Sequence, residues 1–306
     1  MPIINKPQLQ SPPFSVTNVK VAFECPRLFY LKQRFGGEHL FLSKDYIQEI
    51  DSAFLGLANQ LMNMIRQESK IQALFEGQFE ELMVEAIAHQ IQQLFYESIF
   101  FPYLDTIITK DSSLATAFYQ IWQLLTKLIL NISKIIVKNR RYCHENVVVR
   151  RTLITREILL DYTFKIADGK TQKLTGKVNN LIFDFESRRL CVVNYQTYET
   201  VEVSSQLMAV ALYSFLLKQK KKVPVDAVVY WVLPELGEYY YLWEKLENVV
   251  ESLVPAKLQE MREWLRWEES QPDPPPRTEH EYLCDICPQR ERCQSFFDGG
   301  DSTINN

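Results

Sequence analysis

The order of apolar and polar positions divides this chain into a helical half and a half rich in strands. From Asp45 to about Arg140, apolar residues recur at helical spacing. Asp111, followed by two serines, is a typical N-cap for the next helix in this part. The first half is therefore predicted to be an α-helical lobe.

Beyond Glu145, β-branched and aromatic segments alternate with turn residues, a pattern typical of strands. Strands are predicted over 147–155, 158–166, 174–185, 190–195, 225–233 and 239–243. A helix over 206–218 lies between the fourth and fifth of these strands, so we expect a mixed sheet with a crossover and an α/β fold. A last long helix runs from about Trp243 to Glu269, with a break expected near Pro255.

These elements organise the chain into four parts of one composite domain. An N-terminal segment (1–44) precedes the helical lobe (45–144), and an α/β core (145–270) follows it. The last part (271–306) is a proline-rich spacer with a cysteine-rich tail, in which the prolines predict a stiff extended segment.

Composition and charge argue against several classes of protein. The chain is 46% hydrophobic and 12% aromatic, as expected of a globular protein. Its net charge is −4, so no overall basic excess indicates a nucleic-acid partner, and a polyanion would need a local patch. Nine glycines in 306 residues form no glycine-rich phosphate loop, which argues against a nucleotide-fold enzyme.

Apolar segments give no sign of export or of a membrane. The first residues lack the apolar core of a signal peptide. The most apolar long stretch, Trp122 to Val137, is interrupted by two lysines and an asparagine. We therefore predict a cytoplasmic protein with reduced thiols and no membrane partner.

Three cysteines near the end of the chain follow the pattern C-x2-C-x5-C, dense enough for a metal centre. A Cys-Pro step, common in iron–sulfur ligation, supplies a fourth candidate near the N-terminus. The predicted ligands of a [4Fe–4S] cluster are Cys25, Cys284, Cys287 and Cys293. The alternative is a zinc site in the tail alone, with His280 as a ligand. Cys143 and Cys191 lie in apolar or strand contexts, and Cys191 in particular reads as a packing residue.

Several motifs follow one another along the chain: Cys25-Pro-Arg-Leu-Phe-Tyr30, the strand motifs at 174–179 and 191–197, and the final C-x2-C-x5-C cluster. Together they resemble the iron–sulfur branch of the PD-(D/E)xK nucleases, which includes the RecB-like exonucleases of CRISPR adaptation and AddB-type nuclease domains. The resemblance covers about residues 20–295. It implies a restriction-endonuclease-like sheet core and Mg²⁺-dependent cleavage of DNA.

The sequence departs from this family at its catalytic positions. The two metal-binding carboxylates correspond to Asn179 and Asn194, the lysine to Gln196 and the helical histidine to Gln60, whereas Gln206 matches the family's glutamine. Amides bring no negative charge to Mg²⁺, and a glutamine cannot stabilise developing charge as a lysine does. We therefore predict no functional Mg²⁺ site and a catalytically inactive protein. The alternative is an active exonuclease in which Asp184, Glu186, Glu199 or Glu202 replaces a lost ligand.

Two local clusters of positive charge make DNA a candidate partner. They contain Lys138, Arg140, Arg141, Lys220, Lys221 and Lys222. The competing interpretation is that these cations complement helix C-termini. The sequence thus favours a DNA-binding or assembly role in DNA repair or CRISPR-type DNA processing. The remaining hypothesis is a scaffold without a DNA role, whose helical lobe docks a protein partner.

Overall fold

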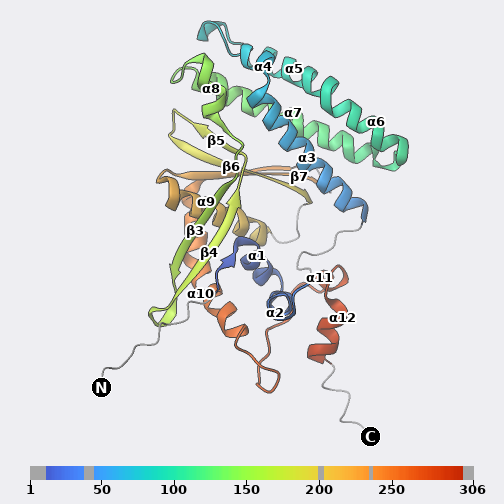
Figure 1. The fold of residues 1–306 in the computed structure, drawn as a ribbon, viewed down its shortest axis with the longest axis vertical. Coiled ribbons are helices and arrows are strands. Elements are labelled where there is room, and N and C mark those ends of the chain that lie inside the picture. The colour runs from blue at the N-terminus through green and yellow to red at the C-terminus, as the bar shows by residue number, and fades with distance from the viewer. Residues whose placement is uncertain (1–11, 38–44, 199–202, 234–236, 299–306) are drawn as a thin grey trace.

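The computed structural model describes residues 12–37, 45–198, 203–233 and 237–298. Helices cover both faces of a central sheet, with the helical lobe on one face (Figure 1). The lobe consists of α3 (Asp45–Gln67), α4 (Ser69–Ala73), η1 (Phe79–Glu81), α5 (Val84–Phe95), η2 (Tyr96–Phe100), α6 (Phe101–Lys110), η3 (Ser112–Leu114), α7 (Ala115–Asn139) and α8 (Glu145–Thr152). The opposite side carries α1 (Val16–Glu24), α2 (Pro26–Phe35), α9 (Val203–Lys221) and α10 (Trp243–Trp264). The predicted helical lobe and mixed α/β architecture are confirmed.

Two sheets form the core. The larger has the order β2-β5-β6-β7-β8, and the smaller has the order β1-β4-β3. Their strands are β1 (Phe14–Ser15), β2 (Leu153–Ile154), β3 (Ile158–Lys165), β4 (Thr171–Val178), β5 (Leu181–Asp184), β6 (Arg189–Tyr198), β7 (Val225–Leu233) and β8 (Gly237–Tyr241). A short turn, η4 (Ala167–Gly169), joins β3 to β4. β6 and β7 are parallel, and α9 connects them, as the predicted crossover requires.

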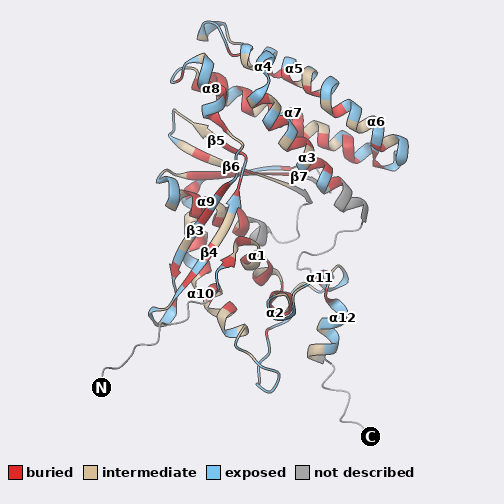
Figure 2. Cartoon of the chain, in the orientation of Figure 1, coloured by how far each residue is buried: buried red, intermediate tan, exposed pale blue. Residues whose placement is uncertain are grey.

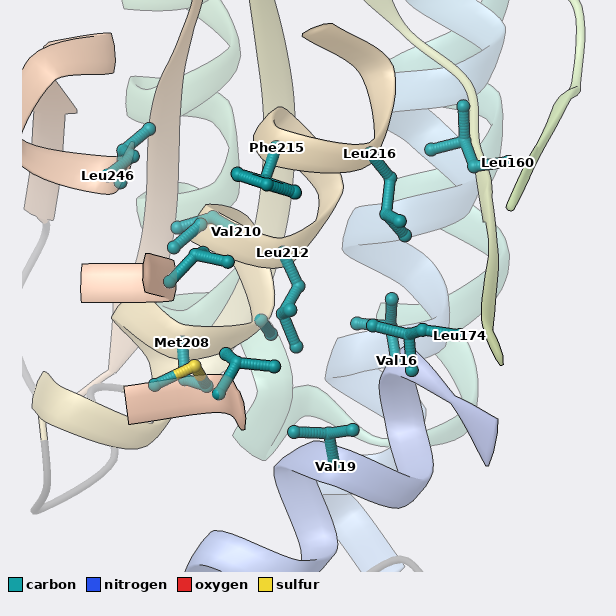
Figure 3. Packing of buried hydrophobic residues seen from close by; sticks show 14 of the residues in the cluster. Val16, Val19, Leu160, Leu174, Met208, Val210, Leu212, Phe215, Leu216 and Leu246 are labelled. Carbon is teal, nitrogen blue, oxygen red and sulfur yellow. The ribbon is translucent and has the colours of Figure 1, made fainter. Parts of the chain in front are cut away.

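Each face of the larger sheet has its own apolar core. Leu190 and Val192 of β6 belong to the core shared with α1, α9 and α10, whereas Val193 belongs to the core of the helical lobe. Figure 2 shows buried residues on both sides of the sheet. In Figure 3, side chains of α9 point toward Val16 and Val19 of α1, which are nearly inaccessible to solvent. The alternation along β6 therefore ties the lobe and the remaining helices to one sheet.

The strand predicted over 147–155 is wrong. Residues 145–152 form α8, and only Leu153–Ile154 are extended. The ring of His144 caps this helix by accepting a hydrogen bond from the N–H of Asn146. Val148 and Val149 are buried in the core of the lobe, so tertiary packing overrides the strand preference of the valines.

Two further boundaries differ from the prediction. The single strand expected over 174–185 is divided into β4 and β5, because Asn180 has a φ of 56° and interrupts the extended backbone. The predicted break at Pro255 is absent, and α10 continues through it. A buried stripe that includes Val250, Val254 and Leu258 holds this helix against the core, which offsets the missing backbone N–H.

The predicted N-cap at Asp111 is confirmed. Its carboxylate accepts a hydrogen bond from the N–H of Ser113 at 2.9 Å and begins the 3-10 turn that leads into α7. Within the described residues, no helix combines the length and the apolar character needed to cross a membrane.

Candidate functional site

Asn179 and Asn194, the two asparagines predicted to occupy the metal-binding positions, meet at the bend between β4 and β5. β5 and β6 are antiparallel, with Leu181 opposite Val192. The N–H of Val193 donates to the carbonyl of Asn180 at 3.0 Å, so the ladder continues past the end of β5. Extending this register by one further residue places Asn179 opposite Asn194. The fold thus brings the two amide positions onto neighbouring strands.

The bend itself is held by a contact with the helical lobe. Asn180 is 2% exposed, and its side-chain amide donates to Oδ1 of Asn59 in α3 at 2.5 Å. Asparagine tolerates a positive φ better than most residues, because its short polar side chain can bond locally. Asn59 therefore fixes the place where the backbone turns at the end of β4.

Gln60, the predicted counterpart of the family's helical histidine, is the next residue of α3. Gln60 is exposed, whereas Asn59 makes the contact to the bend. The Asn-Asn pair after β4 is a recognisable turn signal. Its partner is 121 residues away, and no local pattern in the sequence marks it.

For the remaining amide positions, the structure describes only the backbone. Gln196 lies on β6 and Gln206 in α9, and their side chains lie outside the described part. Glu199 and Glu202, two of the alternative ligands, lie outside the described residues. Asn179 is exposed and Asn194 is partly exposed. The two described positions can therefore meet a ligand through amide donors and acceptors, which hydrogen-bond without contributing charge.

The other two alternative ligands lie at the far end of β5. Asp184 is paired with Arg189, five residues before Asn194 on β6, a separation of about 16 Å along the strand. Lys138 of α7 binds both carboxylates, at 2.9 Å from Asp184 and 2.6 Å from Glu186. These carboxylates belong to the β5–β6 turn and not to the amide site.

Lys138 also changes the acidity of its partners. Its hydrogen bond lowers the pKa of the Glu186 carboxyl. Burial alone would raise the pKa of Asp184, but hydrogen bonds from Lys138 and Ser187 lower that pKa overall. Reciprocally, the hydrogen bonds to Glu186 and Asp184 raise the pKa of Lys138. This candidate nucleic-acid cation is therefore already engaged by two carboxylates.

The other cations of this cluster also make intramolecular contacts. Arg140 donates to the backbone carbonyls of Phe75 and Gly77 at 2.8 Å and pairs with Glu145 at 3.2 Å. The guanidinium of Arg141 lies over the ring of Phe79, 4.7 Å from its centroid. Lys138 therefore connects the end of α7 to the β5–β6 turn, and Arg140 connects it to the segment after α4.

The second cluster lies at the C-terminal end of α9. Lys220 donates to the backbone carbonyl of Leu159 at 2.6 Å. Lys221 and Lys222 are exposed, and the chain turns at Lys222, which has a φ of 61°. This cluster therefore lies at the surface, beside the exposed Leu159 of β3.

Cys25 lies at the junction of α1 and α2, where its thiol accepts the N–H of Leu28 at 3.4 Å. Burial raises the pKa of this thiol to about 12. Electrostatic repulsion from Cys287, Cys293 and Cys284 raises this pKa further. Within the described part of the chain, no three His, Cys, Asp or Glu side chains are arranged to hold a metal ion.

Hydrogen bonds hold the spacer and tail against the N-terminal helices. The hydroxyl of Thr278 donates to the carbonyl of Glu24 at 2.7 Å, and Nε of Arg27 donates to the carbonyl of Pro275 at 3.1 Å. Gln289, which precedes α12 (Arg290–Cys293), donates to the carbonyl of Gly36 at 3.1 Å. Figure 1 shows α11 (Tyr282–Asp285) and α12 close to α2.

An aromatic cluster completes this contact. The final π-helical turn, η5 (Gln294–Asp298), brings Phe296 and Phe297 to within about 6 Å of Tyr30, measured between ring centroids. Trp267 packs on the same two rings, and the guanidinium of Arg27 lies 4.4 Å from the centroid of Phe297. The two segments that carry the cysteines are thus held together by contacts that need no metal.

Comparisons with known proteins give one strong match. The sequence model of the PD-(D/E)XK nuclease superfamily matches residues 13–294. The chain also resembles the crystal structure of SSO0001, with 11% sequence identity and a TM-score of 0.29 over 64% of this chain and 82% of that one. No curated protein matches the sequence.

Proposed function

The chain belongs to the PD-(D/E)XK nuclease superfamily, and we propose that it is a member that binds DNA without cleaving it. The observation that carries the proposal is the position of Asn179 opposite Asn194, on the neighbouring strands to which the resemblance assigns the two metal-binding carboxylates. We assign the chain to the RecB-like iron–sulfur branch, with a role in DNA repair or CRISPR-type DNA processing.

The chemistry of the amides supports this proposal. In metal-dependent hydrolysis, anionic oxygens hold the Mg²⁺ ions that activate water and stabilise the charge of the transition state. Asn179 and Asn194 preserve the shape of carboxylates but supply only weak neutral ligands. Losing one stabiliser of transition-state charge costs about 3–4 kcal/mol, and losses within one catalytic unit are not additive.

A nuclease assay tests the loss of catalysis. Purified protein is incubated with labelled single-stranded and double-stranded DNA in Mg²⁺ and in Mn²⁺, and DNA binding is measured in parallel by fluorescence anisotropy. We expect binding without cleavage. Nuclease activity that co-purifies with the protein and that EDTA abolishes would contradict the proposal. It would support the alternative, an active exonuclease with displaced metal ligands.

We further propose that Cys25, Cys284, Cys287 and Cys293 hold a [4Fe–4S] cluster. The packing of the chain supports this, because hydrogen bonds and aromatic contacts hold the tail that carries three of the thiols against the helices that flank Cys25. Binding requires the thiols to turn toward a common centre. When bound, the cluster would supply a covalent tie between the start and the end of the fold.

Metal analysis after anaerobic purification tests the cluster. We expect about four irons per chain with matching sulfide. Cys25→Ser should lower the iron content, whereas Cys143→Ser should not, because Cys143 is buried in the core of the helical lobe. Stoichiometric zinc without iron would instead support a zinc site.

The surface of the helical lobe favours a second candidate function, the docking of a protein partner. Tyr96, Phe101 and Tyr119 are 38%, 50% and 61% exposed. Aromatic side chains are enriched at protein interfaces. The absence of both DNA binding and cleavage in the assay above would favour this scaffold role.

A further inference from the structure

A cleft of about 670 Å³ opens beside the strand that leads to Asn179. β1 pairs with β4 only through Phe14 and Ser15, after which the chain turns into α1. Among the described strands, none continues this pairing along Gly176–Val178. The cleft therefore lies between the first turn of α1, the β3–β4 hairpin and the outer part of α9.

Gly176 shapes the floor of this cleft. A Cβ atom at this position would lie 3.1 Å from Cγ2 of Val16 and 3.3 Å from Cε1 of Tyr213. The missing side chain allows α1 and α9 to approach the strand closely. The floor is consequently formed by backbone and apolar groups, while the polar side chains stand around the rim.

The rim of the cleft is cationic. Lys173, Lys177 and Lys220 line it together with one carboxylate, Asp161. Lys173 pairs with Asp161 at 2.8 Å and Lys177 pairs with Glu157 at 3.3 Å, whereas Lys220 donates to a backbone carbonyl. Exposed ion pairs of this kind contribute about 0–1 kcal/mol, so these lysines can exchange a carboxylate partner for a phosphate at small cost.

Uncharged donors face the same cleft. The first turn of α1 contains no acidic residue, and the N–H groups of Val16 and Thr17 have no acceptor inside the helix. Ser15, Thr17 and Thr175 also line the cleft; the hydroxyl of Ser15 accepts the N–H of Asn18, and the hydroxyl of Thr175 donates to the carbonyl of Phe14 at 3.2 Å. Lysines, hydroxyls and backbone N–H groups together form the set of donors that contacts sugar–phosphate backbones.

The position of the cleft relates it to the amide site. Lys177 and Asn179 are both exposed and are two residues apart, about 7 Å along an extended chain. We propose that this cleft binds the phosphodiester backbone of a nucleic-acid strand and directs it toward Asn179. The proposal rests on the proposed function and adds to it the surface that receives the ligand.

Substitution of the rim lysines tests the cleft. The cleft variant carries Lys173→Gln, Lys177→Gln and Lys220→Gln, and the matched control carries Lys70→Gln, Lys110→Gln and Lys127→Gln on the exposed surface of the helical lobe. Binding of fluorescein-labelled 30-nucleotide single strands and duplexes is measured by anisotropy between 50 and 200 mM salt. We expect the cleft variant to bind about tenfold more weakly, and the slope of log K against log salt to fall by about two. The control should lose less than about threefold, because its lysines lie away from the ligand.

A second measurement does not depend on variants. Acetylation of lysines in the wild-type protein, with and without the oligonucleotide, is followed by mass spectrometry. Lys177 and Lys220 should be protected by the oligonucleotide, whereas Lys110 and Lys127 should not. Binding that is equal in the cleft variant and the wild type, without protection of Lys177, would overturn the cleft while leaving DNA binding intact. Wild-type protein that binds no DNA at 50 mM salt would overturn the proposed function as well.

Discussion

The amide of Asn180 donates to Oδ1 of Asn59 across 2.5 Å, which connects the bend at the end of β4 to the long helix α3. The same Asn180 accepts the N–H of Val193 through its carbonyl. One residue therefore joins the helical lobe, the bend and β6. The geometry of the amide site depends on a helix that is far away in the sequence.

Removing the acceptor at this contact should destabilise the fold. Asn59→Ala leaves the amide of the buried Asn180 without its partner, which should lower the free energy of unfolding by about 1–3 kcal/mol. Urea denaturation followed by circular dichroism measures the change. Gln60→Ala, one residue later on the exposed side, should stay within about 0.5 kcal/mol of the wild type. Equal effects of the two substitutions would show that the contact contributes nothing.

Placing charged residues at the amide positions should create a metal-binding site. In the triple variant Asn179→Asp, Asn194→Asp and Gln196→Lys, two carboxylates face each other across neighbouring strands. Isothermal titration should detect Mn²⁺ binding to the variant and none to the wild type. If the wild type binds Mn²⁺ and Asp184→Asn removes that binding, the ligands have moved to the β5–β6 turn.

Two glycines, Gly176 and Gly56, should respond in opposite directions to substitution by alanine. At Gly176, a Cβ would crowd Val16, which is buried and β-branched, so Gly176→Ala should destabilise by about 1–3 kcal/mol. At Gly56, inside α3, a Cβ would meet nothing within 4 Å, and Gly56→Ala should stabilise by up to about 1 kcal/mol. Thermal unfolding of the two variants should shift in opposite directions.

The ion pairs of Lys138 should make stability depend on acid pH. Because the pKa of Asp184 and Glu186 is lowered in the folded state, the unfolded chain binds protons first as the pH falls. The stabilisation is complete above the ordinary pKa values of 3.8 and 4.5 and is lost as the pH falls through and below them.

Lys138→Met should flatten this dependence. Urea midpoints measured between pH 3 and pH 7 should fall less steeply for Lys138→Met than for the wild type. Lys134→Met, one turn earlier on the exposed side of α7, should retain the wild-type slope. A parallel fall in all three proteins would exclude the ion pairs as the source.

The aromatic contacts should hold the tail in place without any metal. Phe296→Ala with Phe297→Ala removes the rings that pack on Tyr30 and Trp267. Limited trypsin digestion of metal-free protein should then cut faster after Arg290 and Arg292. Phe101→Ala, on the exposed surface of α6, provides the control. An unchanged digestion pattern would show that other contacts retain the tail.

Local patterns predicted the order of the elements well where helices and strands have clear periodicity. The helical lobe, the N-cap at Asp111 and the crossover between β6 and β7 followed from such patterns. The errors lie where tertiary contacts decide. α8 contains valines that favour strands, but their burial in the lobe favours a helix.

Only those residues of the candidate site that belong to sequence motifs could be predicted. Asn179 and Asn194 could be paired from their places in the strand motifs, and the register agrees with that pairing. The contact between Asn59 and Asn180 joins residues 121 positions apart, so no local spacing could reveal it. The ion pairs of Lys138 with Asp184 and Glu186 could not be predicted for the same reason, because the sequence does not show which charged residues lie close together in the fold.

The apolar core around α1 also bears on the order in which the chain folds. Val16 and Val19 pack against residues of α9 and α10, more than 180 positions later, whereas most contacts of the helical lobe lie within 45–152. During synthesis, which proceeds from the N-terminus, the lobe can collapse while α1 and α2 still lack their partners. Although α1 and α2 are made before the lobe, they are thus expected to reach their native environment after it, and until then their apolar faces are surfaces for a chaperone to cover.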